Sequence, residues 1–313
     1  MTPRRRAGFR ALAALGALGL LAACTPPPSP PTQPPVLDAA CRGALVASVP
    51  GAIASRDVRE LSGLAASRRT DGVWWAHNDS GDSARVFAVA SDGRDLGQFA
   101  LVGASASDWE DLAVGPGPVA GTSYLYVADI GDNAKARPSV RLYRVAEPAV
   151  STGAAVPPPA QTLSGVDALE LVYPDGAHDA EALLVDPVSG NLFVVTKELG
   201  GTAQVFRALA NLPAGSRTTL TQVATVALGF GRPVTAADVT ATGDVVALRT
   251  YSTVALFPRP AGAGLAQAFV QPSCAGAVAS EAQGEAIAFT RDGRAYVTAS
   301  EGANPPLHRF AAP

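Results

Sequence analysis

Acidic side chains recur in this sequence at places where a buried strand is expected. Glu110 lies in DWEDLAV, Glu181 in DAEALLV and Glu285 in QGEAIAF, each within one residue of a following apolar run. A carboxylate is costly to bury unless it is protonated, paired or bound to a cation. Carboxylate oxygens suit a hard cation, and calcium above all, because it accepts many oxygen ligands in loose geometry. The recurring acids therefore predict a calcium site.

The acids belong to a unit that the sequence repeats five times. Each copy has a polar start, an apolar run, a glycine-containing turn and a second apolar run rich in β-branched or aromatic residues, which is typical of a β-hairpin. A candidate third strand follows every copy, and candidate fourth strands precede copies two to five. The copies begin at Glu60, Asp108, Asp179, Ala236 and Gln283.

Repeated four-stranded sheets predict an all-β fold, a five-bladed β-propeller, because a closed ring of sheets leaves few free edges. The last copy lacks a fourth strand, but residues 44–51 form a candidate strand ahead of the first copy. We expect this N-terminal strand to complete the final sheet and close the ring. Residues 150–161, rich in Pro and Ala, lengthen one copy and predict a surface loop.

In a propeller the first strand of each blade lines a central channel, so the aligned position of each copy should contribute to a ring. Like charges in such a ring can share protons or bind a cation. Acids at these positions can instead accept backbone N–H groups of a neighbouring blade, and this alternative stays open. The predicted calcium ligands are the aligned residues Ser62, Glu110, Glu181, Asp238 and Glu285.

The ends of the second strands should lie on the same face as this ring. A mixture of acids and bases above a hard cation could position a phosphate or carboxylate, and a polarised water could attack it. The Asn, Asp and Gly residues of HNDSGD and DIGDN are equally typical of turns, so enzymatic activity stays open. The candidate catalytic residues are His77, Asp79, His178, Lys197 and Arg249.

The N-terminal residues are typical of an export signal. Residues 1–23 contain four arginines and an apolar run too short to span a bilayer comfortably, which predicts a signal peptide. Cys24 follows Leu-Ala-Ala, a pattern that resembles the bacterial lipobox and implies an extracytoplasmic lipoprotein anchored to the membrane through Cys24. The proline-rich residues 24–40 predict a tether, and residues 41–313 a single domain.

Cys41 and Cys274 are the other two cysteines, and in an exported protein we expect them to form a disulfide. Without the four signal-peptide arginines the chain has 20 Lys and Arg against 27 Asp and Glu, a net charge of −7. This charge disfavours nucleic acid as a partner. Because aromatic residues make up only 6% of the chain, we expect a monomer.

A family resemblance rests on a series of motifs over residues 60–306. The motifs ELSGLA, HNDSG, DWEDLAVG, YLYVADIGDN, DAEALLVD, TKE, ALRTY, GEAIAF and SEGANPP, in this order, resemble a group of exported bacterial β-propeller proteins, mostly without an assigned activity. This resemblance implies a fold and not a reaction.

A more remote resemblance concerns the calcium-activated nucleotidases (apyrases). The succession ELSGL, DWEDLAV, HDAEALL, VVALRT and GEAIAF is similar to this family of five-bladed propellers, which have one calcium in the axial channel. By motif position, the resemblance implies calcium ligation by Ser62, Glu110, Glu181 and Glu285. The nucleotide-binding aromatics and arginines of that family have no counterpart that can be located here, so no substrate is implied.

Three functions follow as hypotheses. The first is a lipid-anchored ligand-binding or cell-surface interaction module that holds calcium and binds a small-molecule or surface ligand of unknown identity. The alternative is a calcium-dependent phosphoester or nucleotide hydrolase that uses the same face of the propeller. A sugar or lactone hydrolase is a third hypothesis.

Overall fold

The computed structural model describes residues 1–3, 33–154 and 156–313. Residues 33–313 fold together as one unit of 22 strands with a short helix α1 (Pro35–Cys41) and a 3₁₀ helix η1 (Leu265–Val270). The predicted lipidation site Cys24, most of the predicted signal peptide and most of the tether lie outside the described residues. In the described part of the chain, no helix has the length and apolar character needed to cross a bilayer.

Five sheets of four antiparallel strands form the domain, and each of the first four follows chain order from its inner to its outer strand. The first blade consists of β2 (Leu61–Ala66), β3 (Val73–Asn78), β4 (Arg85–Ala90) and β5 (Asp95–Leu101). The second consists of β6 (Trp109–Pro116), β7 (Ser123–Asp129), β8 (Val140–Ala146) and β10 (Asp167–Val172). The third consists of β11 (Ala180–Val185), β12 (Leu192–Thr196), β13 (Thr202–Ala208) and β15 (Thr221–Ala227).

The remaining strands complete the ring and extend two of its blades. The fourth blade consists of β16 (Val234–Val239), β17 (Val245–Thr250), β18 (Val254–Pro258) and β19 (Cys274–Gly276). The fifth consists of β20 (Gly284–Phe289), β21 (Ala295–Ser300), β22 (Pro306–Ala311) and β1 (Val46–Ala52). Two short strands, β9 (Gln161–Leu163) and β14 (Arg217–Thr219), pair in parallel with the outer strands β5 and β10.

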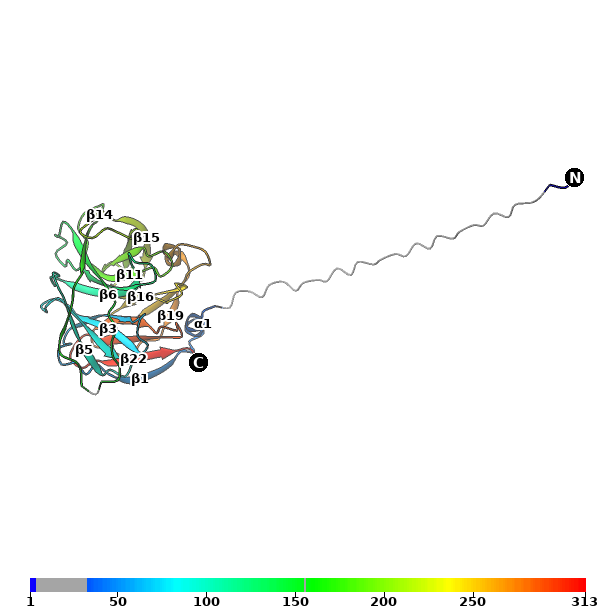
Figure 1. The fold of residues 1–313 in the computed structure, drawn as a ribbon. Helices are drawn as coiled ribbons and strands as arrows, with labels where there is room; N and C mark the ends of the chain where they lie inside the picture. The colour runs from blue at the N-terminus through cyan, green and yellow to red at the C-terminus, as the bar shows by residue number, and fades with distance from the viewer. Residues whose placement is uncertain (4–32, 155) are drawn as a thin grey trace. The chain divides into compact units, whose positions relative to one another are not determined.

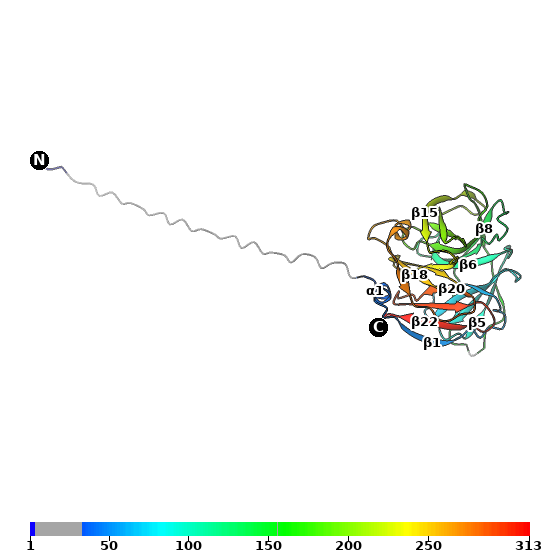
Figure 2. The same ribbon diagram turned by 180° about the vertical axis from the view of Figure 1, so that it is seen from behind.

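The first strands of the blades contact one another in a closed circle. Strand β2 contacts β6, β6 contacts β11, β11 contacts β16, β16 contacts β20, and β20 contacts β2. Strand β1 pairs antiparallel with β22, with Val46 opposite Ala311, and Figures 1 and 2 show the two strands side by side. The predicted five-bladed propeller, closed by an N-terminal strand, is therefore confirmed.

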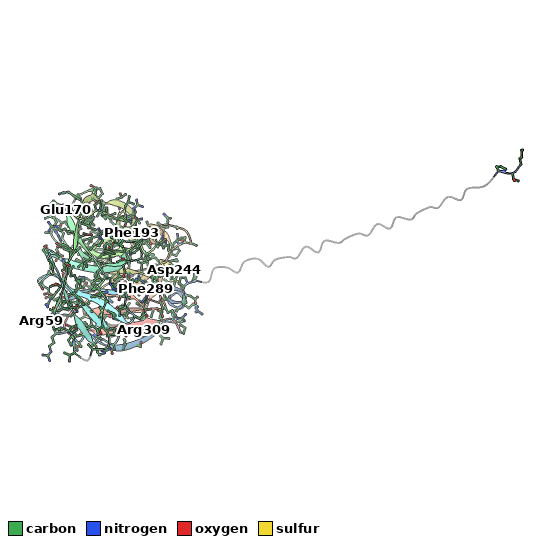
Figure 3. All side chains as sticks on the ribbon, in the orientation of Figure 1. Arg59, Glu170, Phe193, Asp244, Phe289 and Arg309 are labelled. Atoms are coloured by element: carbon green, nitrogen blue, oxygen red, sulfur yellow. A yellow bond between two sulfur atoms is a disulfide. The ribbon has the colours of Figure 1, made fainter. Side chains whose placement is uncertain are left out.

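Apolar side chains fill the spaces between neighbouring blades. Trp75, Phe99 and Trp109, each at most 1% exposed, belong to one cluster between the first and second blades. Side chains of this kind pack the strands into a rigid scaffold, so the ends of the first strands are held in fixed positions around the axis. Figure 3 shows Arg59, which precedes β2, and Asp244, in the turn before β17, on opposite sides of the domain.

The N-terminal end of the domain is fixed by helix α1. Its Val36 and Leu37 are buried against Phe289 and Phe310 of the fifth blade. Cys41 and Cys274 form a disulfide, with Cα atoms 4.9 Å apart, as predicted. The folded unit therefore includes residues 35–40, which the sequence analysis assigned to the tether.

Candidate functional site

An irregularity in strand pairing marks the start of every first strand. In four blades the pairing of the first two strands shifts across one residue, and in the first blade it shifts between Leu61 and Leu64, across Ser62 and Gly63. A β-bulge of this kind breaks the alternation of side chains and re-aims the extra residue. The residues at the four other shifts are Glu110, Glu181, Thr235 and Glu285.

A cavity of about 80 Å³ lies at this end of the channel. Ser62, Glu110, Glu181 and Glu285 all line it, and each is only 3% to 7% exposed. The structure therefore brings together four of the five predicted ligand residues from four different blades. The other lining residues are Leu61, Asp79, Asn133, Lys197, Tyr251, Gln283 and Glu301.

Asp238 does not line this cavity, and its predicted place in the ring is corrected. Its two carboxylate oxygens accept the backbone N–H groups of Val239 at 2.7 Å and of Phe289 at 2.6 Å. The strand register gives the ring position of the fourth blade to Thr235, whose hydroxyl donates to the Gly284 carbonyl at 2.8 Å. Asp238 therefore joins the fourth and fifth blades, which is the alternative role that the sequence left open.

The three ring glutamates that line the cavity, Glu110, Glu181 and Glu285, resist ionisation. Burial raises the pKa of Glu110, and the nearby Glu181 carboxylate raises the same pKa further. Burial also raises the pKa of Glu285 and of Glu181, although Lys197 counteracts the shift at Glu181. Without a compensating positive charge, these carboxyl groups favour their neutral form.

Lys197 supplies one positive charge to the cavity. Its Nζ pairs with Glu181 Oε1 and lies 5.4 Å from the centroid of the Tyr251 ring. Burial by itself would lower the pKa of Lys197, but the Glu181 carboxylate outweighs burial and keeps that pKa above its ordinary value. Among the described residues, no group donates a hydrogen bond to the second oxygen, Glu181 Oε2, which is buried.

Acidic groups continue from the cavity toward the junction of the first two blades. Carboxylate oxygens of Asp79, Asp108 and Glu110 lie within 4.8 Å of one another. Gly131 backs this cluster, since an added Cβ would lie 2.2 Å from Glu110 Oε1 and 2.5 Å from Asp108 Oδ2. Burial and neighbouring carboxylates raise the pKa of both Asp79 and Asp108.

Of the candidate catalytic residues, Asp79 and Lys197 line the cavity and His77 does not. The His77 ring is fully buried, with Nδ1 2.7 Å from the Asn78 carbonyl and its plane edge-on to Trp109. Burial lowers the pKa of His77 to about 4, so the imidazole is neutral near pH 7. This histidine therefore packs between blades.

His178 and Arg249 also lie outside the cavity lining. His178 Nε2 is 2.9 Å from Asp175 Oδ1, and its ring packs against Tyr173 and Phe206. Arg249 is 1% exposed, pairs with Glu281 and donates to the Ala286 carbonyl at 2.8 Å. Both side chains have partners that hold neighbouring segments together.

Two further residues lie near the axis, Thr235 and Asp111, and neither is among the residues predicted from the sequence. Asp111 is fully buried, and its carboxylate accepts N–H groups of Leu112 and Leu183 at 2.8 Å and of Ala237 at 3.4 Å. Its carboxylate thus joins the second, third and fourth blades. The acid directly after Glu110 in DWEDLAV was the available signal for this residue.

A regular distance could have identified Thr235. Glu181 precedes Thr196, the last residue of its second strand, by 15 residues, and Glu285 precedes Ser300 by the same number. Counting 15 residues back from Thr250 gives Thr235, whereas Asp238 lies three residues too late. Asp238 was aligned with the glutamates of the other copies because it is also acidic, and this alignment concealed the spacing.

Comparison of the chain with models of known protein families and with curated proteins gave no match. The class of protein is therefore defined by the structure, which is a five-bladed β-propeller with an acidic cavity at one end of its channel. Propellers of this architecture are suited to binding ligands or other molecules, and the fold alone fixes no reaction.

Proposed function

We propose that this chain is an exported, lipid-anchored binding module that holds calcium in its axial cavity. The observation that carries the proposal is the meeting of Glu110, Glu181 and Glu285 around about 80 Å³, with Glu181 Oε2 buried and unpartnered among the described residues. A buried carboxylate oxygen without a donor costs free energy that a cation could recover.

The chemistry of the lining fits calcium better than a softer metal. The ring side chains in the lining are three carboxylates and one hydroxyl, and His77, a candidate catalytic residue with imidazole nitrogens, is not in the lining. Zinc prefers nitrogen and sulfur, whereas calcium accepts oxygens in flexible geometry. A calcium ion would supply the positive charge that lets Glu110, Glu181 and Glu285 be ionised together.

Helix α1, at the start of the domain, packs at the opposite end of the first strands from the cavity. Its buried residues pack near Phe289 and Phe310, at the ends of β20 and β22, whereas Glu285 lies at the beginning of β20. Figures 1 and 2 show α1 and the C terminus on the same side of the domain. The disulfide fits an oxidising compartment outside the cytoplasm.

A calcium-dependent phosphoester or nucleotide hydrolase is the second candidate, favoured by two lining residues. Asp79 is a partly exposed carboxylate with a raised pKa, which suits a general base, and Lys197 could orient an anion. Phosphate release from nucleoside di- and triphosphates, in calcium and in chelator, tests this activity. Equal rates for the wild type and Glu181→Gln would remove this candidate.

Thermal melting with calcium and with chelator tests the metal site itself. A ligand that binds only the native state stabilises it by about 2.7 kcal/mol at a hundred times Kd, so calcium should raise the Tm of the wild type clearly. Glu285→Gln should lose most of this increase because it removes a lining carboxylate. Glu170→Gln, a control on the outer strand β10, should keep it. A wild-type Tm that is the same in calcium and in chelator would contradict the proposal.

A further inference from the structure

Lys197 holds a special position among the residues that line the cavity. Within that lining it is the single cationic side chain, beside the carboxylates of Asp79, Glu110, Glu181, Glu285 and Glu301. It directly follows β12, and its backbone N–H donates to the Asp179 carbonyl at 2.9 Å. The strand end therefore fixes the base of the side chain, which is 19% exposed.

The charge of Lys197 acts on the whole cavity and not on one partner alone. Besides Glu181, the lining contains the carboxyl groups of Asp79, Glu110, Glu285 and Glu301, and the attraction of the Lys197 ammonium reaches across a cavity of only about 80 Å³. The ammonium thus does in the metal-free protein what a bound cation would do, because it places a positive charge among the lining carboxyl groups.

This inference rests on the proposed cation site. We propose that Lys197 is a tethered competitor for that site, and that it makes the cavity selective for divalent over monovalent cations. Its Nζ already pairs with Glu181 Oε1, so another cation that takes this oxygen must displace the ammonium.

The selectivity follows from charge. Sodium or potassium carries the same charge as the ammonium, so the exchange brings no added attraction to the glutamates. A divalent ion carries twice the charge and can outweigh the loss of the Lys197–Glu181 pair. Because the lysine is part of the chain, its effective concentration at Glu181 is high, and dilute monovalent ions compete poorly.

A purely structural ion pair makes a different prediction. Removing Lys197 would then leave Glu181 buried and unpaired, and the protein would be less stable whatever ion is present. If Lys197 is a competitor, its removal should also strengthen the binding of added cations. The direction of the change in calcium affinity therefore separates the two roles.

The first experiment compares calcium binding by titration calorimetry in the wild type and three variants of the full chain. Lys197→Met should bind calcium about tenfold more tightly or better, because a like charge beside the ion is gone. Lys197→Arg should stay near the wild type because it keeps the charge. Lys135→Met is the matched control, since Lys135 pairs with Glu198 at 3.0 Å and lies outside the cavity lining. It should change the affinity by about twofold or less.

The second experiment needs no calcium. Melting temperatures are compared in sodium chloride and in tetramethylammonium chloride of equal ionic strength, because the large organic cation cannot enter a cavity of about 80 Å³ that is already lined by side chains. Sodium should stabilise Lys197→Met and leave the wild type and Lys135→Met unchanged. If Lys197→Met is unfolded in the organic salt, sodium or calcium should restore its fold.

The outcomes separate this inference from the proposed function. Calcium binding by Lys197→Met but not by the wild type would contradict calcium in the native protein and support the resident ammonium. If the wild type binds calcium as tightly as Lys197→Met, or more tightly, the proposed role of Lys197 as a competitor is overturned. A failure of sodium to stabilise Lys197→Met relative to the organic salt would overturn it as well.

Discussion

Asp111 and Asp238 use their carboxylate oxygens as acceptors for backbone N–H groups of neighbouring blades, whereas Glu110, Glu181 and Glu285 line a cavity. The shorter Asp side chains are saturated by rigid N–H donors, which satisfies a buried carboxylate without a metal. Buried acids near the axis therefore have two roles, and the hydrogen-bond partners of each acid separate them.

Asp238→Asn tests this separation. Asparagine keeps one acceptor oxygen, but its NH₂ group leaves the N–H of either Phe289 or Val239 without an acceptor, so we expect a loss of about 1–3 kcal/mol of unfolding free energy in urea. Calcium affinity should stay within about twofold of the wild type, since no ring residue changes. A large loss of calcium affinity in Asp238→Asn, comparable to that in Glu285→Gln, would return Asp238 to the ring.

The cavity glutamates predict an unusual pH dependence for the metal-free protein. Burial raises the pKa of Glu110 and Glu285 above the ordinary 4.5, so the folded state holds these protons more tightly than the unfolded chain. Stability is then greatest below the ordinary pKa and falls as the pH rises from about 4.5 through the raised folded values. Lowered pKa values, as at Asp82 and Asp292, cost stability only at more acid pH.

Melting in chelator between about pH 5 and about pH 8 measures this fall. Glu110→Gln should flatten it and raise the Tm at the alkaline end, because it removes one repelling carboxylate. Saturating calcium should flatten it too. A metal-free protein whose Tm rises steadily across this range would show that the glutamates are not strained by burial.

At the level of strands, the sequence predicted most elements but not their register. The candidate outer strand of the fourth blade, LAQAFVQP (265–272), was wrong, because residues 265–270 form the 3₁₀ helix η1 and β19 is the outer strand. Turn signals and β-type runs identify each hairpin because they depend on local residue types. A bulge has no such residue requirement here, since the extra positions are occupied by Ser62, Glu110, Glu181, Thr235 and Glu285. For this reason the position of Asp238, three residues from the bulge in β16, could not be distinguished from a ring position by residue type.

Two ring positions are occupied by hydroxyl residues, and both hydroxyls form hydrogen bonds between blades. Ser62 Oγ donates to the Glu110 carbonyl at 2.6 Å, and Thr235 Oγ1 donates to the Gly284 carbonyl at 2.8 Å. Each hydroxyl thus links the first strand of one blade to the first strand of the next blade. These bonds fix the spacing of the strands that carry the glutamates.

Thr235→Val tests the contribution of this link. Valine keeps the shape but leaves the Gly284 carbonyl without its donor, so we expect a loss of about 1–3 kcal/mol in urea unfolding. Thr221→Val, at an exposed position of β15, is the control and should change stability by about 0.5 kcal/mol or less. Equal effects of the two substitutions would show that the interblade hydroxyl contributes nothing.

For the whole molecule, closure of the ring could be predicted but the start of the domain could not. The fifth copy lacked a fourth strand and residues 44–51 had no partner. The pairing of β1 with β22 followed because the backbone N–H and C=O groups of an edge strand favour a partner strand. Helix α1 is only seven residues long, too short for a periodic signal, and Pro34 and Pro35 suggest extended chain. Burial of Val36 and Leu37 against the domain stabilises α1, and the local sequence does not reveal this burial.

The N-terminal segment holds two neighbouring blades at once. Strand β1 completes the fifth blade, while Cys41 at the end of α1 is bonded to Cys274 in β19 of the fourth blade. The bonded residues are 233 positions apart, so the crosslink restricts nearly the whole domain in the unfolded state. In the chain-entropy description, closing a loop of this size stabilises the native state by about 4–5 kcal/mol.

The double variant Cys41→Ser/Cys274→Ser should therefore unfold at a lower urea concentration, with a loss of about 2–5 kcal/mol. Reduced wild type is the matched control and should unfold together with the variant, because both lack the crosslink and keep β1. Calcium affinity should be unchanged, since no cavity residue belongs to α1 or β19. A variant as stable as the oxidised wild type would mean that the pairing of β1 with β22 closes the ring without help from the disulfide.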